Sequence, residues 1–331
     1  LRGVDAALLP RLGNFNDLDH SVRFKLEKAT FAAGPPSPTL PKAERGSFWG
    51  FPRPGARGVG TRNVVAVVGT TARSAALVRA VCRDPRVLSA AQRARREGAF
   101  DGVVAIVHTE AGGEARGEAI PPRNLPLVLR TLRGMVAHAN VGAALVVDSS
   151  SSRGEGDEWI TCASLRRSME DAAAAAARGA GDRAPDAAAE SHPHDLRYVD
   201  AAWCSLSGAW RADVERCVEL LLGGLVARAA AQRRVACPLS ALRLALQCGG
   251  SDAFSGVAAN PLAGHVARHL IAHGGVAVQA ETDELIGAES YFLSSVKSYA
   301  IAARFAAFVA RFKRRLRAHG VALGSIMLRG S

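Results

Sequence analysis

A polar segment at residues 247–264 contains residue types from which a catalytic or binding site could be built. Its sequence is Gln247-Cys-Gly-Gly-Ser-Asp-Ala-Phe-Ser-Gly-Val-Ala-Ala-Asn-Pro-Leu-Ala-Gly264, and it joins an apolar run at 242–246 to an amphipathic run at 261–272. These runs predict a strand and a helix, with Asn260 as the helix cap and Pro261 at the first helical position. The segment is therefore expected to be a loop at the carboxyl edge of a sheet, where exposed amides favour bound anions.

Individual residues of this loop suit binding and catalysis. Gly249 and Gly250 would let the backbone approach a ligand closely. Ser251 and Asp252 are placed to hold hydroxyl groups or a metal-bound water. Cys248 has two equally good interpretations, as a metal ligand or as a small buried residue.

Four carboxylates fall within nine residues after a second short apolar run at 276–279. They are Glu281, Asp283, Glu284 and Glu289. Like charges this close raise one another's pKa unless a cation or an arginine relieves them, so the cluster indicates a metal or a basic partner. Asp283 is equally well explained as a cap of the following helix that faces water.

Two further candidates lie earlier in the chain. His108 ends a predicted strand at 102–107 and is interpreted as a metal ligand or general base, with a structural role as the alternative. Arg62 lies beside Asn63 and would suit a carboxylate clamp, because guanidinium binds carboxylate through two hydrogen bonds.

Three histidines, His265, His269 and His273, repeat at four-residue spacing within the predicted helix that follows the polar loop. On a helix they would form one stripe. Two such histidines usually need a third metal ligand from elsewhere, so an exposed surface stripe is the favoured interpretation.

The composition limits the class of protein. A chain of 331 residues with 48% hydrophobic residues can form two compact domains. No signal peptide and no apolar run long enough for a membrane span is present, so we expect a cytoplasmic protein without a membrane partner. The six cysteines show no CxxC spacing, which argues against a zinc ribbon and favours a reducing compartment.

The formal net charge of +12 comes from arginine, with 37 Arg against 5 Lys. In an alanine-rich chain this bias is typical of genome composition. The densest basic cluster, residues 311–317, alternates with apolar positions at helical spacing and is interpreted as a solvated helix face. No nucleic-acid partner is therefore expected.

Strand-like and helix-like runs alternate from Asn63 onward, which predicts an α/β fold with a parallel sheet. The predicted strands are 64–68, 102–107 and 143–147, and the predicted helices are 73–82 and 125–138. We expect four segments: a tail and Pro-rich linker at 1–46, an α/β domain at 47–152, a low-complexity insertion with a connecting helix (about 209–232) at 153–236, and the beginning of a second α/β domain at 237–331. That second domain is expected to end in an amphipathic helix at about 300–319.

Four ordered landmarks give the chain a family resemblance. They are residues 50–63 (GFPRPGARGVGTRN), 101–108 (DGVVAIVH), the polar loop, and 281–289 (ETDELIGAE). In these segments the chain resembles the altronate and galactarate dehydratases, with sulfolactate sulfo-lyase as a divergent relative. Members of that family continue beyond the equivalent of Ser331, so the chain is expected to be truncated and inactive by itself.

The resemblance implies a metal-dependent hydro-lyase that dehydrates an altronate- or galactarate-like acid to a 2-keto-3-deoxy acid. It implies Fe(II) or Mn(II) as cofactor, a small sugar acid as substrate, and a homo-oligomer as one possible assembly. The implied catalytic residues are His108, Ser251, Asp252 and Glu284; the substrate-binding residues are Arg62, Asn63, Gly249, Gly250, Ser255 and Asn260; and the metal ligands are Cys248, Glu281 and Glu289.

The sequence departs from the family at three loops. Members usually carry cysteines where this chain has residues 69–74 (GTTARS), 109–113 (TEAGG) and 148–152 (DSSSS). The sulfo-lyase relative also lacks several of these thiols. A carbon–sulfur lyase and a catalytically silent family member therefore stand beside the dehydratase as alternatives.

Overall fold

The computed structural model describes residues 26–54, 57–110, 114–115, 118–119, 124–149, 159–179, 199–247, 249, 252–281, 285–286 and 289–320. These residues form two compact units. The first, called the sheet unit, lies within residues 46–241. The second, called the terminal unit, contains the described parts of 1–45 and 242–331.

A four-stranded parallel sheet forms the centre of the sheet unit. Its strand order is β4-β3-β7-β8, and in the register Val65 pairs with both Val103 and Ala143. The two inner strands are almost completely buried, as expected for a parallel sheet covered on both faces. The strands are β3 (Val64–Gly69), β4 (Gly102–Ile106), β7 (Val141–Asp148) and β8 (Ala201–Ser205).

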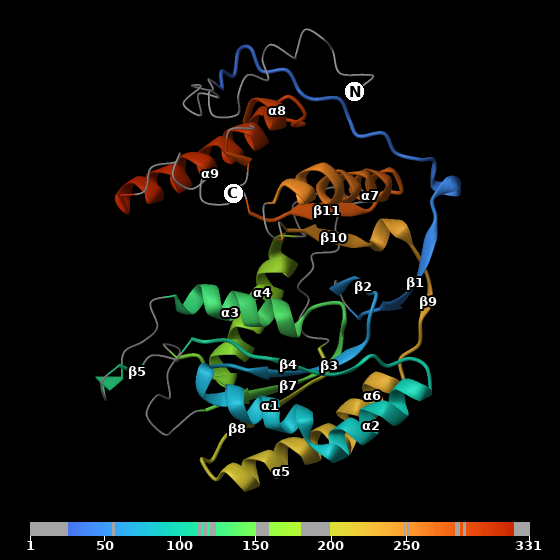
Figure 1. The fold of residues 1–331 in the computed structure, drawn as a ribbon, viewed down its shortest axis with the longest axis vertical. Helices are drawn as coiled ribbons and strands as arrows, with labels where there is room; N and C mark the ends of the chain where they lie inside the picture. The colour runs from blue at the N-terminus through green and yellow to red at the C-terminus, as the bar shows by residue number, and fades with distance from the viewer. Residues whose placement is uncertain are drawn as a thin grey trace. The chain divides into compact units, whose positions relative to one another are not determined.

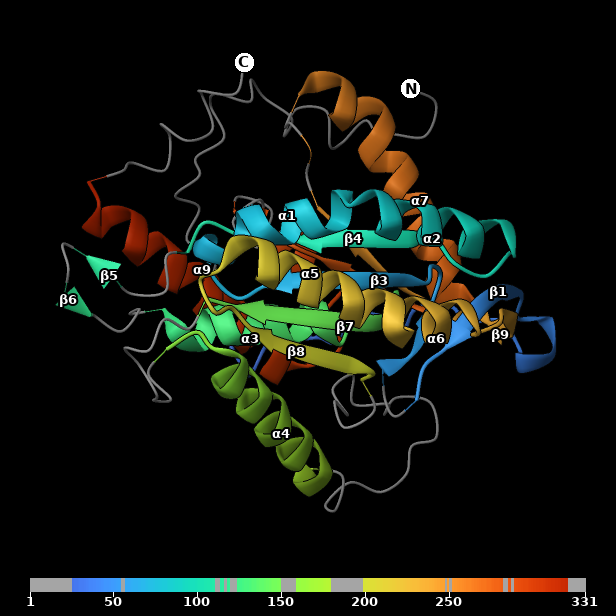
Figure 2. The same cartoon turned by 90° about the horizontal axis from the view of Figure 1, so that it is seen from below.

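Helices cover both faces of this sheet (Figures 1 and 2). Val65, Val67 and Leu145 belong to one core cluster, whereas Ala66 and Val68 belong to the other, because successive strand residues point to opposite faces. The first face carries α1 (Ala75–Arg83), α2 (Pro85–Arg96), α5 (Trp210–Leu220) and α6 (Val226–Ala230), and the second carries α3 (Leu125–Val136) and α4 (Cys162–Gly179). The predicted α/β class is confirmed.

A small antiparallel sheet adds to the unit. Its strand order is β2-β1-β9, and Trp49 pairs with Ala236. Its strands come from both ends of the unit's sequence, so the pairing closes the unit. The strands are β1 (Ser47–Pro52), β2 (Val59–Gly60) and β9 (Val235–Pro238), and a separate two-residue ladder joins β5 (Glu114–Ala115) to β6 (Glu118–Ala119).

The description of residues 153–198 as a low-complexity insertion was wrong for its described parts, whereas the connecting helix that follows it is present. Leu165 and Met169 of α4 are buried against the sheet, and β8 was not predicted at all. The alanine run that suggested low complexity is instead the end of a helix, since alanine is the best helix former. The predicted helix at 209–232 exists, but a π-turn at 221–225 interrupts it, with Gly224 at φ +157°.

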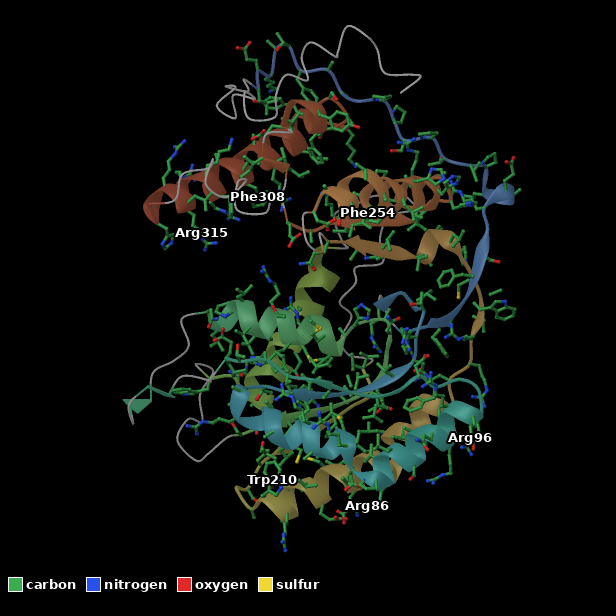
Figure 3. All side chains as sticks on the ribbon, viewed as in Figure 1. Arg86, Arg96, Trp210, Phe254, Phe308 and Arg315 are labelled. Atoms are coloured by element: carbon green, nitrogen blue, oxygen red, sulfur yellow. The ribbon has the colours of Figure 1, made fainter. Side chains whose placement is uncertain are left out.

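The terminal unit is built on a two-stranded parallel sheet. β10 (Arg243–Leu246) pairs in parallel with β11 (Val276–Gln279), and α7 (Asn260–Ala272) connects them. A second apolar cluster joins α8 (Glu289–Leu293) to α9 (Tyr299–Ala318) through Leu293, Phe305 and Val309. The opposite side of α9 is basic and exposed; Figure 3 shows Phe308 and Arg315 projecting from it.

The N-terminal segment differs from the expected free linker where it is described. Leu26 and Phe31 pack against the apolar cluster of α8 and α9. The Gly34 amide donates to the Val296 carbonyl at 2.9 Å, and the Leu40 amide donates to the Ala272 carbonyl at 2.7 Å. Prolines prevent regular structure here, but the extended chain still partly buries its apolar side chains within the terminal unit.

No helix in the described part of the chain is both long and apolar enough to cross a membrane.

A polar group of four residues, called the polar hub, lies at the amino-terminal edge of the parallel sheet: Arg53, Asn63 and Gly142 are buried, and the half-buried Gln232 donates through Nε2 to the Gly142 carbonyl at 3.2 Å. The Arg53 guanidinium donates to Asn63 Oδ1 at 3.1 Å and to Gln232 Oε1. Asn63 Nδ2 donates to two backbone carbonyls at 2.7 Å each. One belongs to Ala99, which follows α2, and the other belongs to Ala229 in α6. The hub therefore links β1, β3, β7 and both helices.

Burial lowers the pKa of Arg53 to about 10, and the neighbouring charge of Arg57 adds to this effect. Burial likewise lowers the pKa of Arg57 to about 10. The Arg57 guanidinium donates to the carbonyls of Ala137, His138 and Val141. Both side chains still carry their charge at neutral pH, and carbonyl oxygens compensate it.

We predict that Gly142→Ala destabilises the protein by about 1–3 kcal/mol, because an added methyl group overpacks the core. A Cβ at position 142 would lie 2.1 Å from Asn63 Oδ1. The matched control is Gly134→Ala in α3, where a Cβ meets no heavy atom within 4 Å; it should stabilise by about 0.5–1 kcal/mol. Urea unfolding of both variants measures the difference, and equal stabilities would contradict the role of the hub.

Candidate functional site

The carboxyl edge of the parallel sheet is where the sheet unit could bind a ligand. β4 and then β7 follow β3 along the chain, but they pair with opposite sides of β3. The topology therefore reverses between β3 and β7. Ligands of open α/β sheets bind at such a switch point, outside the carboxyl ends of the strands. The loops that begin there carry Thr70, His108 and Ser149 within their first two residues.

Hydrogen bonds link these loops to one another. The Thr70 amide donates to the Val147 carbonyl at 3.0 Å, and the Ala72 amide donates to the Glu110 carbonyl at 2.7 Å. The hydroxyl groups of Thr71 and Ser149 lie 3.0 Å apart. The edge therefore holds a pre-formed and largely buried group of hydroxyl side chains, and we call Thr70, Thr71, Ser74, His108 and Ser149 the carboxyl-edge cluster.

His108 is half-buried in this cluster, and both ring nitrogens are hydrogen-bonded. Nδ1 accepts from the Glu110 amide at 3.2 Å. Nε2 lies 2.9 Å from the Thr70 carbonyl, to which it must donate. The ring is thus held as the neutral Nε2–H tautomer, and it would have to give up one of these bonds to act as a base or a ligand.

Thr70 was not among the residues predicted from the sequence to form a site. Of the residues in the cluster, it most clearly indicates a ligand. Its side chain is fully buried, and Oγ1 has no hydrogen-bond partner among the described atoms. An unpaired buried hydroxyl costs about 1–3 kcal/mol and calls for an explanation such as a ligand. The available signal was a hydroxyl residue placed directly after a buried strand.

Arg62 and Asn63, which were predicted to bind substrate, do not lie with the predicted catalytic residue His108 in the sheet unit. They precede β3, whereas the Thr70 loop follows it, and six strand residues span about 20 Å. Asn63 is 0% exposed and belongs to the polar hub. The Arg62 side chain is exposed, so of the two it alone could reach a ligand, and only at the amino edge.

In the terminal unit the polar loop and the acidic loop begin side by side. Leu246 pairs with Gln279 in parallel strands, so both loops leave the same edge. Gln247 Nε2 donates to Glu281 Oε1 at 3.1 Å. Glu281 has φ +61°, the left-handed region that non-glycine residues seldom adopt, and it does so at the candidate site.

Asp252, rather than Asn260, caps the helix that follows the polar loop. Its carboxylate accepts from the Ser255 amide at 2.9 Å and from the Ser255 hydroxyl at 2.5 Å. These hydrogen bonds lower the pKa of Asp252. Helical structure begins just after it, and Figure 3 shows the exposed Phe254 there.

The prediction of Asn260 as the cap was wrong, because Pro261 does not start the helix. Asn260 has helical dihedral angles, and a π-turn at Ser255–Ala259 precedes it. Proline inside a helix cannot donate a backbone hydrogen bond, and the wider turn accommodates that loss. Asn260 is exposed and remains a predicted substrate-binding residue.

The described residues do not include a metal centre. Glu289 is neutralised by Lys313 of α9, with Oε1 and Nζ 2.9 Å apart. Within the described ranges no three His, Cys, Asp or Glu side chains gather so that they could hold a metal. Four predicted residues, Cys248, Gly250, Ser251 and Glu284, lie outside the described residues, and Gly249 is exposed.

The fold and these edges define the chain as an α/β protein with polar sites at strand ends, and comparisons identify its family. Residues 50–179 match the family model "D-galactarate dehydratase/Altronate hydrolase, second domain", and residues 239–330 match "D-galactarate/Altronate dehydratase, C-terminal". The chain belongs to the D-galactarate/altronate dehydratase family.

Curated relatives support this assignment over short segments. Altronate dehydratase of Bacillus subtilis is 52% identical over 56 residues, which is 17% of this chain and 11% of that protein. Altronate dehydratase of Escherichia coli is 38% identical over 81 residues, or 24% and 16%. Galactarate dehydratase (L-threo-forming) of Escherichia coli is 44% identical over 54 residues, or 16% and 10%. The matches thus span less than a fifth of each relative.

We predict that Glu281→Gly is more stable than Glu281→Ala by about 1 kcal/mol, because glycine adopts positive φ without strain. Both variants lose the Gln247 hydrogen bond, so their difference isolates the backbone term. Ala280→Gly is the matched control: its backbone is not left-handed, and the change should destabilise. Chemical denaturation measures all three, and a Glu281→Gly variant no more stable than Glu281→Ala would contradict the strain.

Proposed function

We propose that the protein containing this chain is a hydro-lyase that dehydrates an altronate- or galactarate-like acid to a 2-keto-3-deoxy acid. The observation that supports this most strongly is the pair of family-model matches, which follow each other in chain order. The first falls within the sheet unit and the second almost wholly within the terminal unit. The relatives named dehydratases support the same reaction class.

Such a dehydration removes a weakly acidic proton next to a carboxylate and expels the β-hydroxyl. A divalent ion that binds the carboxylate would stabilise the developing charge as a Lewis acid. Fe(II) or Mn(II) is proposed here on the family resemblance alone, because the described residues do not form a site for it. No step is therefore assigned to the metal.

The carboxyl-edge cluster suits a polyhydroxylated acid. Hydroxyl groups both donate and accept hydrogen bonds, so Thr70, Thr71 and Ser149 can bind sugar hydroxyls without burying a charge. Within this cluster, Thr70 Oγ1 is a buried hydroxyl that lacks a hydrogen-bond partner. His108 can move a proton once its bond to Thr70 or Glu110 opens. We therefore propose that this edge holds the hydroxylated part of the substrate.

The polar and acidic loops of the terminal unit are proposed to form a binding site of their own, with carboxylates and hydrogen bonds. Glu281 is held by Gln247 in a strained conformation, and Asp252 is held by Ser255. Both carboxylates are positioned before any ligand binds, which lowers the ordering cost of binding. Ser251, Glu284 and Cys248 remain predicted members of this site.

The function is tested by measuring keto-acid formation from altronate, galactarate and sulfolactate, with Fe(II) or Mn(II) added. We expect turnover of a sugar acid by a protein that contains this chain, and little or none by residues 1–331 alone. Release of sulfite from sulfolactate would instead identify the carbon–sulfur lyase. A protein that binds metal but converts none of the three acids would be the silent family member.

We predict that Thr70→Val has opposite effects on stability and activity. Valine has the shape of threonine but no hydroxyl, so removing the unpaired group should stabilise by about 1 kcal/mol. Loss of a substrate hydrogen bond should lower kcat/KM by about tenfold or more. Thr131→Val is the control. The Thr131 hydroxyl lies on the exposed side of α3 and donates to the Leu127 carbonyl. Unchanged kcat/KM in Thr70→Val would remove the carboxyl-edge cluster from the substrate site.

A further inference from the structure

His265 and His269 lie on the exposed side of α7. They are four residues apart on a 13-residue helix, and both side chains are exposed. Their ring centroids are 4.5 Å apart at an interplanar angle of 64°. Helical residues at this spacing face each other, so the two imidazoles already meet without any change of the backbone.

Neither ring takes part in a hydrogen bond or ion pair in the described part of the chain. This distinguishes the pair from His108, whose two nitrogens are both used, and from His138, whose Nδ1 accepts from the Asn140 amide. The approach to the pair is also open, because a Cβ on the preceding Gly264 would meet no heavy atom within 4 Å. Both imidazoles can therefore offer a nitrogen lone pair to an ion from solution.

We propose that His265 and His269 form a chelating site for a borderline transition-metal ion, namely Ni(II), Zn(II) or Cu(II). Two histidines four residues apart on one helix face is the arrangement by which helices present two ligands to zinc. Imidazole suits these ions, whereas Mn(II) and Mg(II) prefer oxygen ligands. Water fills the remaining positions, because no third His, Cys, Asp or Glu joins the pair in the described residues.

This site is distinct from the metal of the proposed dehydratase reaction. That reaction is proposed to use Fe(II) or Mn(II), which bind nitrogen ligands more weakly than Ni(II), Zn(II) or Cu(II). Metal found on the purified protein can therefore come from α7 rather than from the reaction site. Arg268 is exposed between the two histidines in sequence, and its charge weakens the affinity without blocking the nitrogens.

The test is titration calorimetry of the 1–331 chain with NiCl₂ and ZnCl₂. We expect one ion per chain, and binding weakened by about tenfold or more in His265→Ala or His269→Ala, because one imidazole loses the advantage of a second linked ligand. His319→Ala, which removes a lone exposed histidine after α9, should bind as the wild type does.

A matched control keeps the number of histidines and changes only their spacing. The double variant His269→Ala, Val266→His places the second histidine at an exposed neighbouring position, where side chains do not face each other. It should bind as weakly as His269→Ala. Equal binding by the wild type and the double variant, or full displacement of bound Ni(II) by equimolar Mn(II), would overturn the proposal, as would the absence of any binding.

Discussion

The polar hub is the constraint on which the sheet unit depends. A guanidinium buried away from carboxylates keeps its charge only if carbonyl and amide oxygens surround it. Arg53 finds those oxygens on Ala139, Arg62, Asn63 and Gln232, which come from widely separated parts of the chain. Because each oxygen must be in place at once, the turn after β1, the start of β3, the end of α3 and the segment after α6 can order only together.

This constraint gives the two edges of the parallel sheet different roles. At the amino edge the buried polar atoms of Arg53 and Asn63 are satisfied by protein groups, so nothing there calls for a ligand. At the carboxyl edge Thr70 Oγ1 is buried and unpaired. Residues 50–63, a sequence landmark shared with a family of enzymes, can therefore have a structural role, because they hold the sheet together. The loops at the opposite edge remain free to differ in chemistry.

Much of the fold could be predicted from the sequence, because buried parallel strands are continuous apolar runs. The strands at 64–68, 102–107 and 143–147 were predicted within a few residues of β3, β4 and β7. β8 was missed because its short sequence, Ala-Ala-Trp-Cys-Ser, has no such run. α4 was missed because its alanines resemble low complexity, and its buried stripe appears only when residues four apart are compared.

The candidate site was less predictable, because residue types indicate chemistry but not which partners are already taken. Asp252 and Glu289 were chosen as carboxylates, yet one caps a helix and the other pairs with Lys313. Asn63 was chosen for its position in a motif, and its amide is fully used inside the core. Hydroxyl residues attract less notice in a sequence than acids, histidines or cysteines, although Thr70 carries a buried hydroxyl with an unmet hydrogen bond. If the family's thiols at this edge are replaced by hydroxyls, the edge keeps its capacity to bind oxygen-rich ligands and loses its affinity for soft metals, since hydroxyl oxygen is a hard ligand.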